Sequence, residues 1–344
     1  MADRKLNIGF IGCGRVADNH YKALKLCPQA ELKSVSDLNK KIGQKKAKDW
    51  NVFFYENPDD LINNKEVDVV FILTPLETHY YYAKKVINNK KHVLVEKPIS
   101  LNPEEIKELQ ILSELNDVVC FPGHSYLYLP EIVRMIDFIK DGVIEKPVYM
   151  YMSEIYQMPI ELINIYHGPM IEVIWHSLYI LIALFGLPSK VSGFSSCFRK
   201  EIMSNISDQI VVSAIFDEGA MAQIFTSWVI EDETSDPWTF KIKVFGTNGC
   251  VNFSRRDVVN ETMKFDSKSS FPSYSQPLYG EMFKKEVDYF INRCILNDEK
   301  PLSSMEDAYF TSVLLNAVQY ACANNVVVNL TEYINKKLFL KKER

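Results

Sequence analysis

The chain lacks the features that mark several common classes of protein. Its longest apolar run, residues 178–188, is far shorter than the ~20 residues that cross a membrane. Its seven cysteines are odd in number and form no CxxC pair, and its net charge of −5 disfavours a nucleic-acid partner. Residues 1–5 have no signal-peptide pattern. We therefore expect a cytoplasmic protein with reduced thiols and with neither a membrane nor a nucleic-acid partner.

Metal-ligand spacing is absent as well. The six histidines and seven cysteines do not fall into the short, paired spacings that hold zinc and related ions. We therefore expect no metal site.

The length of 344 residues is too great for one ordinary core and predicts two domains. Residues 1–122 alternate strand-like and helix-like segments with short connections, which is typical of a parallel, doubly wound sheet. The helix at 103–115 has a strong start signal, because Asn102 suits the cap and Pro103 the first turn. The expected strands are 6–11, 31–36, 67–73, 92–96 and 118–121, and the expected helices are 16–26, 40–48, 77–88 and 103–115.

Residues 123–335 have a different pattern, with longer β-rich runs. The expected strands are 148–156, 190–197, 209–216, 220–228, 240–245 and 250–254, and residues 246–249 form a hairpin turn between the last two. This pattern predicts a second domain with an antiparallel or mixed sheet. We expect the helices 169–185 and 280–297 to cover one face of it, and a further helix at 305–324. The many β-branched and aromatic strand residues predict self-association through this sheet, as a homodimer or homotetramer.

A glycine-rich turn, Gly12-Cys13-Gly14-Arg15-Val16-Ala17, follows the first expected strand and opens a helix. Gly12 permits the tight turn, Gly14 lets the backbone approach a pyrophosphate, and Ala17 keeps the helix close to the sheet. Asp37 ends the second strand 20 residues after Ala17, where it accepts hydrogen bonds from an adenosine ribose. The alternative interpretation is an ordinary strand–turn–helix with Asp37 as a turn residue.

Asp37 also bears on the choice of cofactor. A carboxylate at this position repels the 2′-phosphate of NADP, and Leu38 stands where an NADP enzyme often has an arginine. Lys40 and Lys41 are near enough in sequence to leave NADP open, although such helix charges are more often only solvated. The sequence therefore favours NAD, with NADP as the alternative.

Two further segments carry a family resemblance. The run 92–98 ends in Glu96-Lys97-Pro98, and Thr74-Pro75 with His79 follows the third main strand. With the glycine turn, His20, Ala23 and the segments 245–249 and 281–290, they are similar to the Gfo/Idh/MocA oxidoreductases, the family of glucose-fructose oxidoreductase and inositol dehydrogenase. The resemblance implies a Rossmann domain, then an α/β domain with a large open, mostly antiparallel sheet. It also implies reversible hydride transfer between NAD(P) and a ring alcohol or ketone. The residues it places at the cofactor are Gly12, Cys13, Gly14, Arg15, Val16, Asp37, Leu38, Thr74, Pro75, His79, Glu96 and Lys97.

Lys97 follows the expected strand 92–96, at the edge of a parallel sheet where ligands bind. Oxidation of a secondary alcohol leaves a proton on oxygen, and a lysine suits its removal because burial and a cationic cofactor ring lower its pKa. The alternative is a surface lysine at a strand end. The bend needed to aim Lys97 predicts a cis peptide bond before Pro98.

Glu172, His176 and Tyr179 share one face of the expected helix 169–185. Other positions on this helix are apolar, so a polar ridge predicts a wet cleft. In the family the corresponding helix bears an acid and, four residues later, the catalytic histidine. The resemblance therefore makes His176 a second proton-transfer group, oriented by Glu172. In the family a second acid is frequent at the position of Tyr179, so the substrates of family members cannot be assigned to this chain. The alternative is a core histidine satisfied by Glu172.

Three tyrosines are candidate substrate contacts: Tyr126, Tyr156 and Tyr179. Tyr126 lies at the crossover between the domains, and Tyr156 lies on the first strand of the second domain. Aromatic rings stack on sugar faces, but a strand tyrosine more often packs within its sheet.

The expected activity is that of an NAD(P)-dependent dehydrogenase or reductase. It moves a hydride to or from a ring CH–OH group of a sugar, nucleotide sugar or cyclitol. Open alternatives are a reductase of a non-sugar ketone or diol, a catalytically silent NAD-binding regulator, and an enzyme that retains its cofactor through the cycle.

Overall fold

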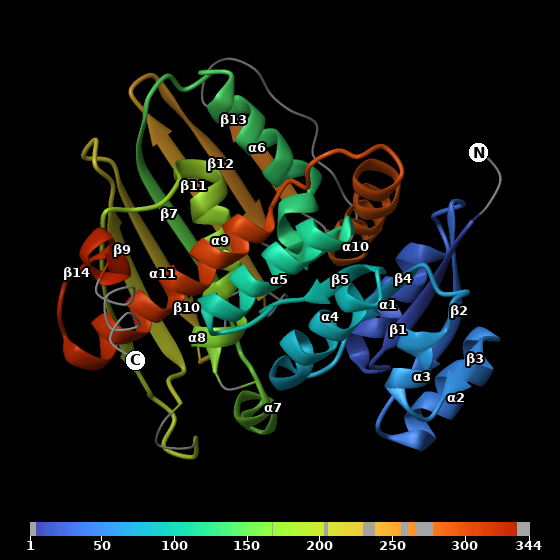
Figure 1. The fold of residues 1–344 in the computed structure, drawn as a ribbon. Coiled ribbons are helices and arrows are strands. Elements are labelled where there is room, and N and C mark those ends of the chain that lie inside the picture. The colour runs from blue at the N-terminus through green and yellow to red at the C-terminus, as the bar shows by residue number, and fades with distance from the viewer. Residues whose placement is uncertain are drawn as a thin grey trace. The chain divides into compact units, whose positions relative to one another are not determined.

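The computed structural model describes residues 5–166, 168–202, 206–229, 238–255, 261–265 and 278–335 (Figure 1). The chain divides into two compact units. The first contains Met1–Leu129 and Tyr279–Tyr309, and the second contains Pro130–Leu278 and Phe310–Arg344. The predicted division into residues 1–122 and 123–335 is contiguous, whereas the first compact unit takes in a late segment of the chain.

The first unit is built on a six-stranded sheet in the order β3-β2-β1-β4-β5-β6, with every pair parallel. This is the predicted doubly wound sheet, and its strand order reverses between β1 and β4. Ligands bind at such a switch point, outside the carboxyl ends of the strands. The strands are β1 (Leu6–Ile11), β2 (Ala30–Ser36), β3 (Phe53–Tyr55), β4 (Val69–Ile72), β5 (His92–Glu96) and β6 (Cys120–Gly123).

Local signals place the helices between these strands. The Asn102 side chain accepts a hydrogen bond from the Glu104 N–H (3.2 Å), which confirms the predicted cap of α5. Short β3 and α3 were not expected from the sequence, because three strand residues and six helix residues show little periodicity. The helices are α1 (Arg15–Leu24), α2 (Lys40–Trp50), α3 (Pro58–Asn63), α4 (His79–Asn88) and α5 (Pro103–Asn116), with 3₁₀ turns η1 (Leu76–Thr78) and η2 (Ser125–Tyr128).

The helix expected at 280–297 is wrongly assigned to the second domain. It forms as α10 (Leu278–Asp288) and a π-helical turn, Tyr289–Ile295, and it packs on the first unit. The Phe290 ring lies 4.7 Å from Phe121 and 5.8 Å from Phe71, both on parallel strands. Apolar periodicity identified the helix, but it does not say which of two sheets the apolar face covers.

The second unit holds an eight-stranded sheet in the order β13-β12-β11-β7-β10-β9-β8-β14. The β7–β10 pair is parallel and every other pair is antiparallel, as predicted. The expected hairpin pairs Gly246 with Gly249, whose φ of +110° requires glycine. The strands are β7 (Pro147–Tyr156), β8 (Lys190–Ser196), β9 (Gln209–Ile215), β10 (Met221–Ser227), β11 (Trp238–Gly246), β12 (Gly249–Arg255), β13 (Glu261–Phe265) and β14 (Val328–Asn329).

The two faces of this sheet differ. Met150, Ile224 and Ile242 belong to a buried face. Ile215, Met221, Tyr149 and Phe245 are successive cross-strand partners in one row and therefore share the other face. Ile215, Met221 and Phe245 are exposed, as is Phe194 at 67%. The helices of this unit are α6 (Pro130–Lys140), α7 (Ile160–Ile165), α8 (Pro169–Glu172), α9 (Ile174–Phe185) and α11 (Met305–Asn324).

The predicted helix 169–185 forms as α8 followed by α9. Val173 separates α8 from α9, with φ −101° and ψ −48°. The nine buried residues of α9 include Trp175 and Leu178 as well as His176 and Tyr179. Among the described helices, none combines the length and the apolar character needed to cross a bilayer.

Candidate active site

The glycine turn has the geometry of a phosphate-binding loop. Gly12 has φ +96°, and a Cβ on it would lie 2.5 Å from the Leu73 carbonyl oxygen. A side chain is therefore excluded on both counts. A Cβ on Gly14 would meet no described atom within 4 Å, so the backbone at the start of α1 is open to a ligand. Ala17 is fully buried under the sheet edge. These features fit a pyrophosphate on the N-terminus of α1.

Asp37 ties the glycine turn to the end of β2. Its Oδ2 accepts a hydrogen bond from the Cys13 N–H (2.8 Å), and its Oδ1 accepts one from the Asn39 N–H (2.7 Å). Each carboxylate oxygen keeps capacity for a second donor, such as a ribose hydroxyl. Leu38 is 78% exposed. Lys40, which left NADP open, forms an ion pair with Glu56 (2.8 Å).

Cys13 contributes its backbone to this loop. Burial, followed by the charge of Asp37, raises the pKa of the Cys13 thiol to about 12. A thiol with that pKa remains protonated at neutral pH and is a poor nucleophile. Arg15 and Val16 follow at the first turn of α1, with Arg15 exposed and Val16 half-buried.

Glu96 supports the Lys97 backbone from inside the core. Its Oε1 lies 2.7 Å from His20 Nε2, and its Oε2 accepts a hydrogen bond from the Lys97 N–H (3.1 Å). Burial favours protonation of Glu96, but the hydrogen bond and charge of His20, with the charge of Lys97, outweigh it and hold the Glu96 pKa below its usual range. Glu96 is therefore an anion beneath Lys97. The Lys97–Pro98 bond is cis, as predicted.

His79 joins the two loops that follow β4 and β5. Its Nδ1 lies 2.7 Å from the Pro98 carbonyl oxygen, and its Nε2 lies 2.7 Å from the Thr74 carbonyl oxygen. The Thr78 hydroxyl oxygen lies 2.8 Å from Thr74 Oγ1 and 2.9 Å from the Pro75 carbonyl oxygen. The Thr74-Pro75 segment is thereby fixed at the carboxyl edge of the sheet.

His124 and Tyr126 follow β6 at the same edge. His124 Nδ1 lies 2.7 Å from Ser303 Oγ, so residues 179 positions apart meet within the first unit. Burial, with the charge of Lys97, lowers the pKa of His124 to about 3. His124 is therefore a neutral imidazole close enough to feel the charge of Lys97. Tyr126 is buried beside it in η2.

The second unit carries the other candidate residues. His176 and Tyr179 lie one turn apart on α9, and the His176 Nδ1 lies 2.5 Å from the Tyr179 hydroxyl oxygen. Tyr179 is buried, and Glu172 is half-buried at the end of α8. Tyr156 ends β7, with its ring 5.9 Å from that of buried Trp228. The structure thus brings His176 and Tyr179 together within this unit, and the orienting role of Glu172 stays a prediction. Lys97 and Tyr126 belong to the first unit, so their meeting with His176 also stays a prediction.

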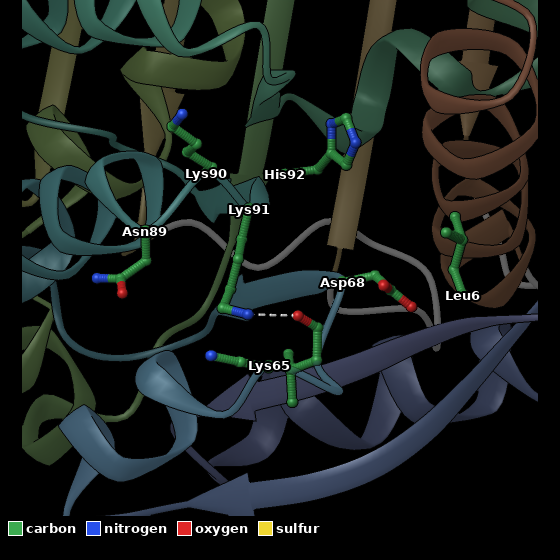
Figure 2. Close-up of a pocket in the computed structure, with 8 residues that line it drawn as sticks. Leu6, Lys65, Asp68, Asn89, Lys90, Lys91 and His92 are labelled. Carbon is green, nitrogen blue, oxygen red and sulfur yellow. Dashed lines mark hydrogen bonds between the residues drawn. The ribbon is translucent and has the colours of Figure 1, made fainter.

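A pocket of about 370 Å³ lies at the opposite edge of the parallel sheet (Figure 2). It is lined at the amino-terminal ends of β1, β4 and β5, by Leu6, Asp68 and His92 among others. The Lys91 ammonium in this pocket donates to the carbonyls of Val67 (2.5 Å) and Asn64 (2.8 Å). Lys91 therefore has a structural role, because its ammonium binds two main-chain carbonyls. The pocket lies away from the glycine turn.

A parallel sheet of this order, with a glycine turn at the switch point and an acid at the end of the second strand, defines a dinucleotide-binding domain. The chain belongs to the Gfo/Idh/MocA family. Residues 6–124 match the family model described as "Oxidoreductase family, NAD-binding Rossmann fold", and residues 133–252 match the GFO/IDH/MocA C-terminal domain. The protein is thus an NAD-binding oxidoreductase.

Relatives match along the whole chain. The myo-inositol 2-dehydrogenase of Thermotoga maritima is 24% identical, over 96% of this chain and 100% of that protein. The scyllo-inositol 2-dehydrogenase (NAD+) of Bacillus subtilis is 26% identical, over 89% of this chain and 91% of that protein. Among solved structures, levoglucosan dehydrogenase in complex with NADH has a TM-score of 0.85 at 18% identity, covering 95% of this chain and 99% of that one. These matches confirm the predicted fold class.

No group of three or more histidine, cysteine, aspartate or glutamate side chains within the described ranges is arranged to hold a metal ion. The residues of the first unit that could hold NAD are those of the glycine turn, Asp37, and the Thr74 and Lys97 loops. Sequence reasoning assigned no role to His20, whose bond to Glu96 spans 76 residues of sequence.

Proposed function

We propose that the protein is an NAD-dependent dehydrogenase of a cyclitol or sugar, in which Lys97 and His176 handle the proton of the reacting hydroxyl. The observation that carries this proposal is the placement of Lys97 at the carboxyl end of β5. Its main chain is held there by buried, anionic Glu96. That edge of the sheet also bears the glycine turn. The inositol dehydrogenases among the relatives support a polyhydroxylated ring as substrate.

In this proposal NAD supplies the acceptor for the hydride. The chain's own groups bind and orient the substrate and take up the hydroxyl proton. His176 can serve through Nε2, because its Nδ1 is engaged by the Tyr179 hydroxyl. Glu172 orients His176, and Tyr126 and Tyr156 contact the substrate. Tyr179 remains a candidate substrate contact, although its hydroxyl already lies against His176.

The direct test follows NADH absorbance while purified protein is offered myo-inositol, scyllo-inositol, free sugars and nucleotide sugars with NAD. We expect at least one ring alcohol to be oxidised by the wild-type protein and not by Lys97→Ala. A protein that binds NAD but oxidises none of these compounds contradicts the proposal and favours a catalytically silent regulator.

We propose NAD rather than NADP because Asp37 is fixed at the end of β2 with a negative charge facing the site of the extra phosphate. Lys40, one of the two lysines that left NADP open, lies beside Glu56 on the surface. Titrating both cofactors measures the preference directly, and tighter binding of NADP would overturn it.

We propose that the protein self-associates through the exposed face of its eight-stranded sheet, as a homodimer or homotetramer. The row of Ile215, Met221, Tyr149 and Phe245, with Phe194 on β8, three strands away from β7, presents apolar side chains to solvent. Sedimentation at micromolar concentration should show an oligomer, and Met221→Lys should weaken it. A monomeric wild-type protein would contradict this.

We also propose a cytoplasmic location. All seven cysteines are outside disulfides, which fits a reducing compartment.

A further inference from the structure

His79 makes contacts that a neutral histidine cannot satisfy. Its ring is 2% exposed, and both of its nitrogens lie 2.7 Å from main-chain carbonyl oxygens. One carbonyl belongs to Thr74, two residues after β4, and the other to Pro98, two residues after β5. The two loops belong to neighbouring strands of the parallel sheet. The ring therefore links the loop before η1 to the loop that carries Lys97.

The chemistry of the acceptors fixes the state of this ring. A carbonyl oxygen can only accept a hydrogen bond, so each nitrogen must carry a proton to bond with it. Neutral imidazole has one N–H and would place a lone pair against the second carbonyl. The imidazolium has two N–H groups and satisfies both. Only the cation can therefore bond to both carbonyls at once.

The surroundings hold the second proton only weakly. Burial lowers the pKa of His79, and the bonds to Pro98 and Thr74 and the charges of Glu96 and Glu77 oppose it without overcoming it. His79 is also the first residue of α4, where the positive end of the helix disfavours a cation. As pH rises, the ring therefore loses one of its two N–H protons. It then bonds to one of the two loops instead of both.

We propose that His79 is a positioning residue for Lys97, a clamp that holds the Lys97 loop to the Thr74 loop while its ring carries two protons and releases one loop when it carries one. The inference rests on the proposed function, in which Lys97 handles the substrate proton. Glu96 holds the Lys97 main chain from the core side, and His79 holds the next residue, Pro98, from the side of α4. His79 thus acts on the reaction through Lys97, and it couples that lysine to a loop that the family resemblance places at the cofactor.

Nitrogen-15 NMR of histidine-labelled protein tests the clamp without a substrate. His79→Gln identifies the His79 signals by their loss. We expect both ring nitrogens to be protonated at the acid end of the range in which the protein stays folded, and one to lose its proton as pH rises. The backbone amide of Lys97 should shift over the same pH interval. A His79 ring that keeps the same number of protons throughout that range overturns the proposal.

Kinetics then test the consequence for Lys97. A glutamine amide carries both of its N–H donors on one nitrogen and presents an acceptor oxygen beside it, so it does not reproduce two donors at the positions of Nδ1 and Nε2. His79→Gln should therefore resemble the single-proton state. We expect wild-type kcat to fall as pH rises through the His79 titration, roughly tenfold for a loop displaced by a fraction of an ångström. The kcat of His79→Gln should stay at the lower value and should not fall over the same pH interval. The matched control is His92→Gln, a half-buried histidine at the other end of β5, whose Nδ1 accepts from the Val119 N–H (3.0 Å). It should keep the wild-type profile.

A lower melting temperature for His79→Gln with an unchanged pH profile would make His79 a purely structural residue and overturn the proposal. Failure of every ring alcohol as substrate would count against the proposed function instead, and the NMR titration would still decide whether the clamp exists.

Discussion

The two units position their candidate residues in different ways. In the first, the residues follow parallel strands, and each is held by bonds to a neighbouring loop or to the core, as with Asp37, Glu96 and His79. In the second, His176 and Tyr179 lie on the buried helix α9 and contact each other across one turn. The candidate residues of the first unit are thus held by hydrogen bonds between distant segments, and His176 is placed by the helix on which it lies. Substitution of Asp37 should therefore affect cofactor binding most, and substitution of Lys97 or His176 should affect turnover most.

The largest effect is expected for the two residues to which the proposed function assigns the proton of the substrate hydroxyl. His176→Ala and Lys97→Ala should each lower kcat by about 10²–10⁴, the usual loss on removing a general acid or base. NAD affinity should change little for His176→Ala and modestly for Lys97→Ala. Glu172→Gln should be milder, because Tyr179 still contacts the imidazole. Steady-state kinetics and NAD titration measure both quantities, with exposed Lys107→Ala as control. A near-normal kcat for His176→Ala would make His176 structural.

A smaller effect is confined to the first unit. Asp37→Ala removes a charged acceptor and should weaken NAD binding by about 1.5–3 kcal/mol, the range for hydrogen bonds to charged groups. NADP should be affected less, so the gap between the two cofactors narrows. Because Asp37 also bonds the Cys13 N–H, part of the loss reflects a looser glycine turn. Calorimetric titration of both cofactors is the measurement, and Asp60→Ala on the surface of α3 is the control. An unchanged ratio of affinities would exclude Asp37 from cofactor choice.

The core of the first unit should make stability depend on pH. Glu286 on α10 is 0% exposed, and neither of its carboxyl oxygens has a hydrogen-bond partner in the described structure. Burial, then the charge of Glu96, raises its pKa well above the usual value. A raised pKa contributes stability that is complete below the unfolded value of about 4.3 and is lost as pH rises toward the folded value.

Glu286→Gln removes that titration. Relative to the variant, the wild-type free energy of unfolding should fall as pH rises above about 4.3, by at most about 1.4 kcal/mol per pH unit for one proton. Chemical denaturation at several pH values measures this. Glu281→Gln, one to two turns earlier on α10 and half-buried, is the matched control. Parallel curves for wild type and Glu286→Gln would show that Glu286 ionises normally.

The smallest effect concerns thiols in the two units. Cys13 is buried with a pKa raised to about 12, whereas Cys197 is exposed in the second unit. Alkylation near pH 8 should therefore modify Cys197 and leave Cys13 intact, with little change in NAD affinity. Mass spectrometry of labelled peptides checks this, and Cys197→Ser should abolish the fast reaction. Rapid labelling of Cys13 would mean that the glycine turn opens in solution.

The sequence patterns predicted more of the fold than of the candidate site. The parallel sheet was predictable because each strand and its turn are short-range signals, and Gly12 and Asp37 stand at a recognisable spacing. The hairpin at Gly249 and the run of β-rich segments were predictable for the same reason. The sheet that α10 covers was not predictable, because an apolar helix face can pack on either sheet. The contact between Phe290 and Phe121 shows that this segment packs on the parallel sheet.

The hydrogen bonds that support the candidate residues could not be predicted from the sequence. His20 and Glu96 are 76 residues apart, and His124 and Ser303 are 179 apart, so spacing says nothing of either pair. His79 was placed at the cofactor by family resemblance, and only the structure shows that both of its nitrogens meet main-chain carbonyls.

On the ribosome, the first unit cannot complete its core when its own strands have emerged. Domains generally fold as units, amino-terminal first, during synthesis. Here Phe71 and Phe121 lack the ring of Phe290 until nearly the whole second unit has been translated. The nascent parallel sheet therefore carries uncovered apolar surface while the intervening chain is made. The order of the elements along the chain thus sets how long this apolar surface stays uncovered during synthesis.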